Sequence, residues 1–299
     1  MQHTQGRIKE RVPTEFHDFH PPDFNRSTPV AEVRPHGQAS RSGLTVRPHG
    51  LEWESNRHAP TRLNKATGII LRLIHARKTH DYRIILHMPH LTLPVTAFQQ
   101  NCSLIWCAAT RRAALIDPGG EADRLLDWVN ATGVKLDRLL LTHGHLDHVG
   151  AALELSQRLS IPILGPQAED AFWLEQLPVQ AAQFGFPPAL AFTPDQWLKD
   201  GEVVALGELR LEVIHCPGHT PGHVVFFNRA EGVAFVGDVL FAGSIGRTDF
   251  PRGNHAALLA GIRNRLFPLG DDIAFVPGHG PDSTFGRERR TNPYVGEGA

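Results

Sequence analysis

Six consecutive residues, His143 to His148, hold three imidazoles and one carboxylate. Burying such groups is costly, and a folded interior accepts them only with hydrogen-bond partners or a bound cation. Imidazole nitrogen is a ligand for Zn, Fe, Ni and Cu, and carboxylate oxygen suits the harder ions of that series. In an extended or turning loop, residues two apart reach a common side, which groups His143, His145 and Asp147 and leaves His148 apart. The run therefore predicts a metal site and indicates that it serves two ions.

Three further ligand-type residues, His219, Asp238 and His279, stand alone later in the chain. Each follows a short apolar run rich in Val, Ile or Phe, and each is next to a glycine. This pattern is typical of a strand that ends in a sharp turn and presents a polar group at its end. Glycine also lets the backbone approach a ligand closely. We predict that these three residues complete the site begun by the histidine-rich run.

The order of these residues, H-x-H-x-D-H followed by a distant His, Asp and His, resembles the metallo-β-lactamase superfamily. Over roughly residues 89 to 295 the chain is similar to the short type II glyoxalases, which hydrolyse thioesters of glutathione. Four segments carry this second likeness: residues 94–102, 116–120, 244–251 and 284–289. The resemblance implies an α/β fold, an αββα sandwich with its site at one edge between the sheets.

The resemblance also divides the seven residues between two divalent metal ions. It implies three histidines for the first ion, two histidines and an aspartate for the second, and an aspartate shared by both: His143, His145 and His219; Asp147, His148 and His279; and Asp238. Three neutral imidazoles leave an open position for water, as in catalytic zinc sites. We expect zinc, with Fe or Mn as alternatives, because the ligand types suit all three. Aspartate at position 238 disfavours a β-lactamase proper, since many of those have cysteine there.

We expect the reaction to be hydrolysis of a glutathione thioester, with Asp147 and Asp238 as catalytic residues that also ligate the ions. A metal pair ~3.5–4 Å apart can share a hydroxide at neutral pH, and this hydroxide would attack the thioester carbonyl. Two alternatives stay open. Persulfide dioxygenases, which bind one iron, share the fold and resemble residues 246–250, and a lactonase or another hydrolase of the superfamily fits the same ligands.

Substrate recognition has weaker signals. Glutathione carries two carboxylates, which favour arginine donors. The candidates are Arg247, Arg252, Arg287, Arg289 and Arg290, although each is equally consistent with an ordinary exposed or ion-paired arginine. Residues 177–197 are apolar yet irregular, and they form either a wall of the pocket or part of the core. Asp117 either caps an Asp-Pro-Gly turn or orients a ligand imidazole.

Composition limits the other classes of function. A net charge of −1 gives no reason to expect a nucleic-acid partner. No apolar run reaches the ~18 residues of a membrane helix, and the N-terminus does not read as a secretory signal. Cys102, Cys107 and Cys216 make an odd count, which favours free thiols and a cytoplasmic, reducing compartment. We interpret Cys102 and Cys107 as buried, and Cys216 as an improbable ligand because seven other groups already fill two sites.

Residues 1–87 differ from the rest of the chain. They contain 14 Lys and Arg against 8 Asp and Glu, a net charge of +6, and they lack sustained apolar patterns. Such a low-complexity basic segment buries too little apolar surface to fold alone. Three interpretations compete: a basic tail for anionic partners, a transit peptide, or an over-extended start whose true beginning is Met88. We favour the third, which makes residues 88–299 the hydrolase domain.

From Met88 onward the apolar spacing predicts alternating strands and helices. We expect helices over residues 121–129, 149–159 and 255–266. The predicted strands are residues 104–106, 113–116, 136–141, 161–164, 203–206, 209–214, 224–227, 233–236 and 273–276. The first two of these strands should pair with each other.

Overall fold

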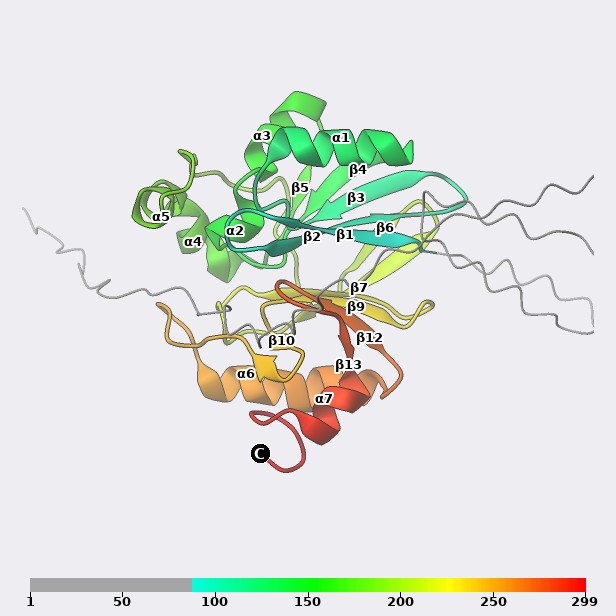
Figure 1. Cartoon of the computed structure of the whole chain (residues 1–299), viewed down its shortest axis with the longest axis vertical. Helices are drawn as coiled ribbons and strands as arrows, with labels where there is room; N and C mark the ends of the chain where they lie inside the picture. Colours follow the sequence, from blue (N-terminus) through cyan, green and yellow to red (C-terminus); the bar gives the residue numbers. More distant parts are fainter. Residues whose placement is uncertain (1–87) are drawn as a thin grey trace, which may run out of the picture. The chain divides into compact units, whose positions relative to one another are not determined.

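The computed structural model of the chain describes residues 88–299, so the predictions for residues 1–87 lie outside the described residues. Two β-sheets face each other, and helices cover the outer face of each (Figure 1). The first sheet has the order β1-β2-β3-β4-β5, and the second has the order β13-β12-β9-β8-β7-β6. This is the αββα sandwich that the resemblance implied.

The first sheet and its helices occupy the first half of the described residues. Its strands are β1 (His90–Val95), β2 (Gln100–Trp106), β3 (Arg112–Ile116), β4 (Lys135–Leu140) and β5 (Ile163–Leu164). Helices α1 (Ala122–Thr132) and α3 (Ala152–Leu159) cover its outer face (Figure 1). Shorter helical segments follow at the end of the sheet that carries the site: α2 (Leu146–Val149), η1 (Ala168–Asp170), α4 (Ala171–Glu175) and α5 (Leu177–Phe184).

The second sheet and its helices follow. Its strands are β6 (Val203–Leu206), β7 (Leu209–His215), β8 (Val224–Asn228), β9 (Val233–Gly237), β12 (Ala274–Pro277) and β13 (Ser283–Thr284), and β10 (Leu240–Phe241) pairs separately with β11 (Ser244–Ile245). The outer face carries α6 (His255–Gly261), η2 (Ile262–Leu266), η3 (Phe267–Leu269) and α7 (Phe285–Thr291). None of the helices between residues 88 and 299 is long and apolar enough to cross a membrane.

Strand periodicity builds the core in three layers. Neighbouring residues of a strand point to opposite faces, so Leu104 packs with the helical layer and Ile105 packs between the sheets. Helix α1 buries Leu125 and Val129, four residues apart on one face, and it ends at Gly133 in the left-handed conformation, φ 66°. The predicted pairing of the first two strands is confirmed, with Ile105 opposite Ala114.

Two predicted helices differ from the observed ones. The helix expected over residues 149–159 begins only at Ala152 as α3, because Val149 belongs to the preceding short helix α2 and the two helices are separated at Gly150. A Cβ atom there would lie 2.5 Å from the carbonyl oxygen of Gly119, and the amide of Ala151 donates to the carbonyl of Pro118 instead of continuing α2. As a result Asp147 and His148 lie on a short helix, which corrects the loop expected for them. The helix expected over 255–266 changes to a π-helical turn at Ile262.

Candidate metal centre

Most of the ligand-type side chains follow directly after the carboxyl ends of strands. The His143–His148 run follows β4, Asp238 follows β9, and His279 lies two residues after β12. Strands β3 and β4 are parallel, as are β9 and β12, so their ends meet at one edge of each sheet. Open sheets commonly bind ligands outside the carboxyl ends of such strands. The two sheet edges thus form one site.

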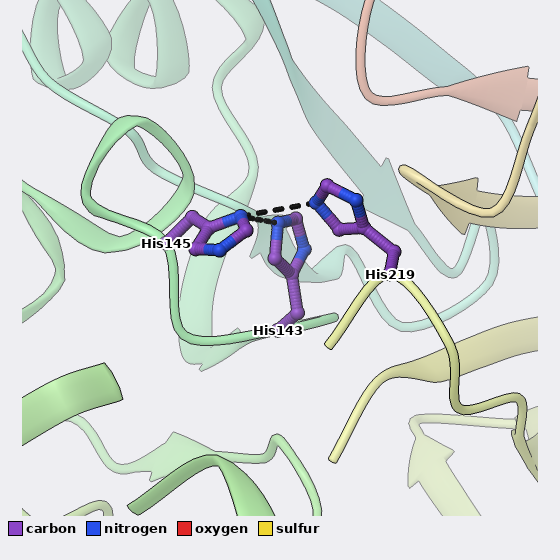
Figure 2. A group of neighbouring side chains, drawn as sticks. All are labelled: His143, His145 and His219. Carbon is purple, nitrogen blue, oxygen red and sulfur yellow. Dashed lines mark hydrogen bonds between the residues drawn. The ribbon is translucent and has the colours of Figure 1, made fainter. Parts of the chain in front are cut away.

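Three histidine nitrogens form the first group of this site. His143 Nε2 lies 3.1 Å from His145 Nδ1, which lies 3.0 Å from His219 Nε2. Figure 2 shows the three rings turned toward a common point although His219 comes from a different loop. Ligands of a tetrahedral zinc ion at ~2.0–2.1 Å stand about 3.3 Å apart. The spacing therefore fits one cation.

Two carboxylates and two histidines complete a second group beside the first. His279 Nε2 and His148 Nε2 lie 3.2 and 3.7 Å from Asp147 Oδ2. Asp238 Oδ1 lies 3.4 Å from His148 Nε2. Its other oxygen, Oδ2, lies 3.6 Å from His219 Nε2 and 3.7 Å from His279 Nε2. The carboxylate of Asp238 therefore faces both groups, with one oxygen near His148 and the other near His219 and His279.

Hydrogen bonds on the outer side fix which nitrogen points inward in two of the rings. His219 Nδ1 donates to the carbonyl oxygen of Arg247 at 2.7 Å, and His279 Nδ1 donates to the carbonyl oxygen of Phe98 at 3.1 Å. In the neutral ring, each Nε2 then carries the lone pair and faces the site. Such an outer acceptor is the usual way in which proteins orient metal-binding histidines.

Asp117 performs the same task for the histidine-rich run. One of its oxygens accepts from the Thr142 hydroxyl at 2.6 Å and lies 2.9 Å from His148 Nδ1. The Thr142 oxygen in turn lies 3.0 Å from His143 Nδ1. His148 Nε2 and Asp238 Oδ1 are buried and have no hydrogen-bond partner among the described residues. Inward-facing ligand atoms without hydrogen-bond partners are what bound cations would satisfy, so these residues fit a metal pair. Of the two alternatives for Asp117, the contacts favour orientation of an imidazole.

The charges of the site are strongly coupled. Burial lowers the pKa of His143 and His145 well below the ordinary histidine value. Burial acts in the same direction on His148, but Asp238 and Asp147 outweigh it and raise the pKa of His148 well above the ordinary value. Burial favours a neutral Asp238, yet His148 and His279 lower the pKa of Asp238 well below its ordinary value. The carboxylates are therefore ionised and attract positive charge into the site.

Comparison with known proteins identifies the family. The sequence profile described as the Metallo-beta-lactamase superfamily matches residues 95–279. The chain belongs to this superfamily. It is 52% identical over 204 residues to the hydroxyacylglutathione hydrolase GloC of Haemophilus influenzae, covering 68% of this chain and 96% of that protein. The expected glyoxalase II-like branch of the superfamily is confirmed, and the chain is a metal-dependent hydrolase.

Two solved structures resemble the chain closely. BLEG-1, a B3 metallo-beta-lactamase, has a TM-score of 0.64 and 34% identity, over 69% of this chain and 99% of the other. TTHA1623, solved in a di-iron-bound form, has a TM-score of 0.63 and 36% identity, over 69% of this chain and 100% of the other. The αββα fold is thus shared over nearly the whole length of both solved structures.

Two buried polar residues of this metallo-beta-lactamase site were not predicted. Asp170 accepts from the amide of Gly144 at 2.9 Å, the Thr220 hydroxyl at 2.8 Å and the amide of Gly222 at 2.6 Å, so it links the two loops of the first group. Burial raises the pKa of Asp170 to about 6. His223 stacks on His143. No sequence signal points to Asp170, whereas His223 repeats the Pro-Gly-His pattern nearby in the loop of His219.

The candidate arginines lie in two places. The backbone of Arg247 contacts His219, and its guanidinium pairs with Asp249 at 2.6 Å and stacks 4.8 Å from the ring of Phe250. Arg252 lies 4.0 Å over the ring of Phe172. The others are on α7, where, within residues 88–299, their ion pairs are with acids outside the metal groups: Arg287 with Glu288, Arg289 with Asp271 and Glu297, and Arg290 with Asp271.

Aromatic side chains flank both ligand groups. Beside the first group, the ring of Phe250 lies 4.9 Å from His145. Beside the second, Phe98 packs 6.0 Å from Phe184 and 5.1 Å from Phe186. The segment 177–197 is therefore not irregular throughout, because it begins with α5, and it contributes both to the core and to this aromatic wall.

The cysteines take no part in the metal groups. All three are free and buried. Cys216 lies in the core beneath α6, and burial raises its pKa to about 12. Cys216 belongs to none of the clusters of ligand-type side chains among the described residues.

Proposed function

We propose that this protein hydrolyses a glutathione thioester, with S-lactoylglutathione as the model substrate, and that its seven ligand-type residues hold two divalent ions. The observation that carries the proposal is the position of Asp238, whose carboxylate faces both the three-histidine group and the group of Asp147, His148 and His279. The 52% identity to a hydroxyacylglutathione hydrolase supports the choice of substrate.

Two ions bound there would lower the pKa of a coordinated water towards ~7 and polarise the thioester carbonyl. Asp238 fixes the spacing of the two ligand groups because its carboxylate is common to both. Asp147 contacts His148 and His279 through Oδ2. We assign to its other oxygen the role of accepting a hydrogen bond from the attacking water, which orients that water toward the carbonyl carbon. No side-chain nucleophile is required.

For the substrate, we assign the carboxylates of the thiol carrier to Arg247 and Arg252. Both lie beside the first ligand group, at the aromatic rings of Phe250 and Phe172. Arg247 is half-exposed at 47% of its side chain, so its ion pair with Asp249 is weakly held and a carboxylate can compete for it. Arg287 and Arg289 lie on α7, where their ion pairs are with acids outside the metal groups, and we assign them no substrate contact.

Zinc is the proposed ion, and Fe or Mn fits the oxygen-rich second group equally well by ligand type. The di-iron-bound form of TTHA1623, which is 36% identical to this chain, supports iron as the alternative ion. The protein chain's contribution is the same for all three ions, because it supplies the same nitrogens and oxygens.

The test is turnover of S-lactoylglutathione by the purified full chain, followed as release of free thiol under anaerobic conditions. We expect hydrolysis without oxygen and loss of it in Asp238→Ala. Oxygen uptake with a glutathione persulfide, one iron per chain and no thioester cleavage would instead assign the protein to the dioxygenase reaction. The His90→Gln variant is the control, because this half-buried residue lies on β1 outside the ligand groups.

A further inference from the structure

His223 is a histidine beside the metal centre that belongs to neither ligand group. It lies directly before β8 and is fully buried. Its ring stacks on the ring of His143, with centroids 4.7 Å apart and an interplanar angle of 17°. The stacked ring of His223 limits how far the ring of His143 can tilt on that side. The plane of one ligand imidazole is thus set by a second imidazole behind it.

The same ring holds the backbone of the shared carboxylate. The amide of Asp238 donates a hydrogen bond to His223 Nε2 at 3.1 Å. An amide is always a donor, so Nε2 must carry the lone pair and cannot also bind a metal ion. His223 is therefore neutral, with its proton on Nδ1. That nitrogen has no hydrogen-bond partner among the described residues.

Gly237 makes this contact possible. Its φ is +49°, and a Cβ atom there would lie 2.7 Å from His223 Nε2 and 2.5 Å from the Thr142 hydroxyl. Its carbonyl accepts from the amide of Gly278 at 2.8 Å, next to His279. The turn that carries Asp238 is thus packed against the ring of His223 on one side and the loop of His279 on the other.

Simple packing does not explain a histidine at this position. An aliphatic or phenyl side chain would fill a buried space without leaving an unpaired N–H group. What the imidazole adds is one acceptor, aimed at the Asp238 amide, together with a flat face against His143.

We propose that His223 is a positioning residue of the metal centre, which holds the Asp238 backbone and the His143 ring so that the shared carboxylate spans both ligand groups. The inference rests on the proposed two-ion site. It predicts that loss of the Nε2 acceptor displaces Asp238 and weakens the coupling between the ions, even where the chain stays folded.

Two variants separate the acceptor from the ring. His223→Gln places an amide oxygen near the position of Nε2, whereas His223→Phe keeps the stacked ring and removes the acceptor. Each protein is loaded with Mn(II), and two measurements are made: affinity for the second ion by chelator competition, and exchange coupling of the ion pair by electron paramagnetic resonance. His90→Gln is the matched control, and thermal unfolding checks the fold. If the phenylalanine variant does not fold, His223→Met replaces it.

We expect the parent and His90→Gln to show an exchange-coupled pair. His223→Phe should lose the coupled signal and bind the second ion roughly 10- to 100-fold more weakly, while His223→Gln keeps the signal. A coupled pair that survives in folded His223→Phe, or a folded glutamine variant that loses as much as phenylalanine, would overturn the role of His223. A parent chain with no coupled pair would contradict the two-ion site itself, so the two failures are distinguishable.

Discussion

His148 Nδ1 lies 2.9 Å from a carboxylate oxygen of Asp117, on the side of the ring that faces away from the other metal ligands. The second oxygen of Asp117 accepts from the amide of Thr142 at 2.7 Å, so the backbone holds the carboxylate in place beside the imidazole. Both groups are buried, at 0% and 2% exposure. The bond therefore fixes the ring plane of His148 and directs Nε2 toward Asp147 and Asp238.

Replacing Asp117 with asparagine should weaken metal binding without removing a ligand. The amide has only one acceptor oxygen for the Thr142 and His148 contacts, so His148 loses its orientation. We expect the affinity for the second ion to fall roughly 10- to 100-fold, measured by competition with a chelator. Asp127→Asn, an exposed position on α1, is the control. An unchanged affinity in Asp117→Asn would show that the carboxylate does not orient the ring.

Metal loading should release protons at neutral pH. In the metal-free protein, burial opposes charge on His148 and His279, but Asp238 outweighs it and raises the pKa of both histidines. Each ring must be neutral to bind an ion, so binding displaces its proton. We expect on the order of one to two protons per chain, followed with an indicator dye in weak buffer, and fewer in His279→Ala. Metal affinity should accordingly fall as the pH is lowered. Loading without proton release would contradict this charge arrangement.

Asp170 should make the metal-free protein less stable as the pH rises. Its pKa in the folded chain is about 6 against an ordinary 3.8, so the folded state holds a proton that the unfolded state has lost. This proton binding contributes about 3 kcal/mol to the free energy of unfolding. The contribution is complete below pH ~4 and is lost as the pH rises through about 6. Asp170→Asn lacks this titration.

The check is urea unfolding of the parent and Asp170→Asn from about pH 4 to pH 7, with a chelator present. The asparagine variant should be less stable throughout, because its NH2 group meets the donors of Gly144, Thr220 or Gly222. The difference should be largest near pH 4 and should shrink toward pH 7. Parallel curves would show that Asp170 is ionised in the folded state across the whole range.

Arg247 and Arg252 are expected to act on the Michaelis constant for a glutathione thioester more than on kcat. Each removed arginine loses a charge-assisted contact, and we expect KM to rise roughly tenfold per substitution by alanine. Arg287→Ala on α7 should leave KM unchanged. An equal rise in KM for Arg247→Ala and Arg287→Ala, measured under the same conditions, would contradict the assignment of the substrate carboxylates to a site beside the first ligand group.

The seven ligand-type residues could be predicted from the sequence because their residue types and local spacing already indicate metal binding. A run such as His143–His148 has few uses in a folded interior other than metal binding, and the strand-turn-glycine pattern around Asp238 and His279 predicts where the polar group emerges. Their assignment to two ions came from the resemblance, and the structure brings all seven together at one edge.

The residues that hold the metal ligands in place could not be predicted from the sequence, because only their tertiary contacts reveal this role. Asp170 is an acidic residue in a helical segment until the fold brings it against Gly144 and Gly222. The break between α2 and α3 likewise depends on Gly119, which lies 31 residues before Gly150 in the sequence. Apolar spacing continues through Gly150, so periodicity alone predicts one uninterrupted helix there.

The number of divalent ions bound per chain is the most direct measurement, made on the protein as purified and paired with S-lactoylglutathione turnover. We predict two ions per active chain, one ion left in His279→Ala, and loss of both hydrolysis and full occupancy in Asp238→Ala. Full occupancy and full activity in Asp238→Ala, or an active parent that holds a single ion, would contradict a shared carboxylate between two metals.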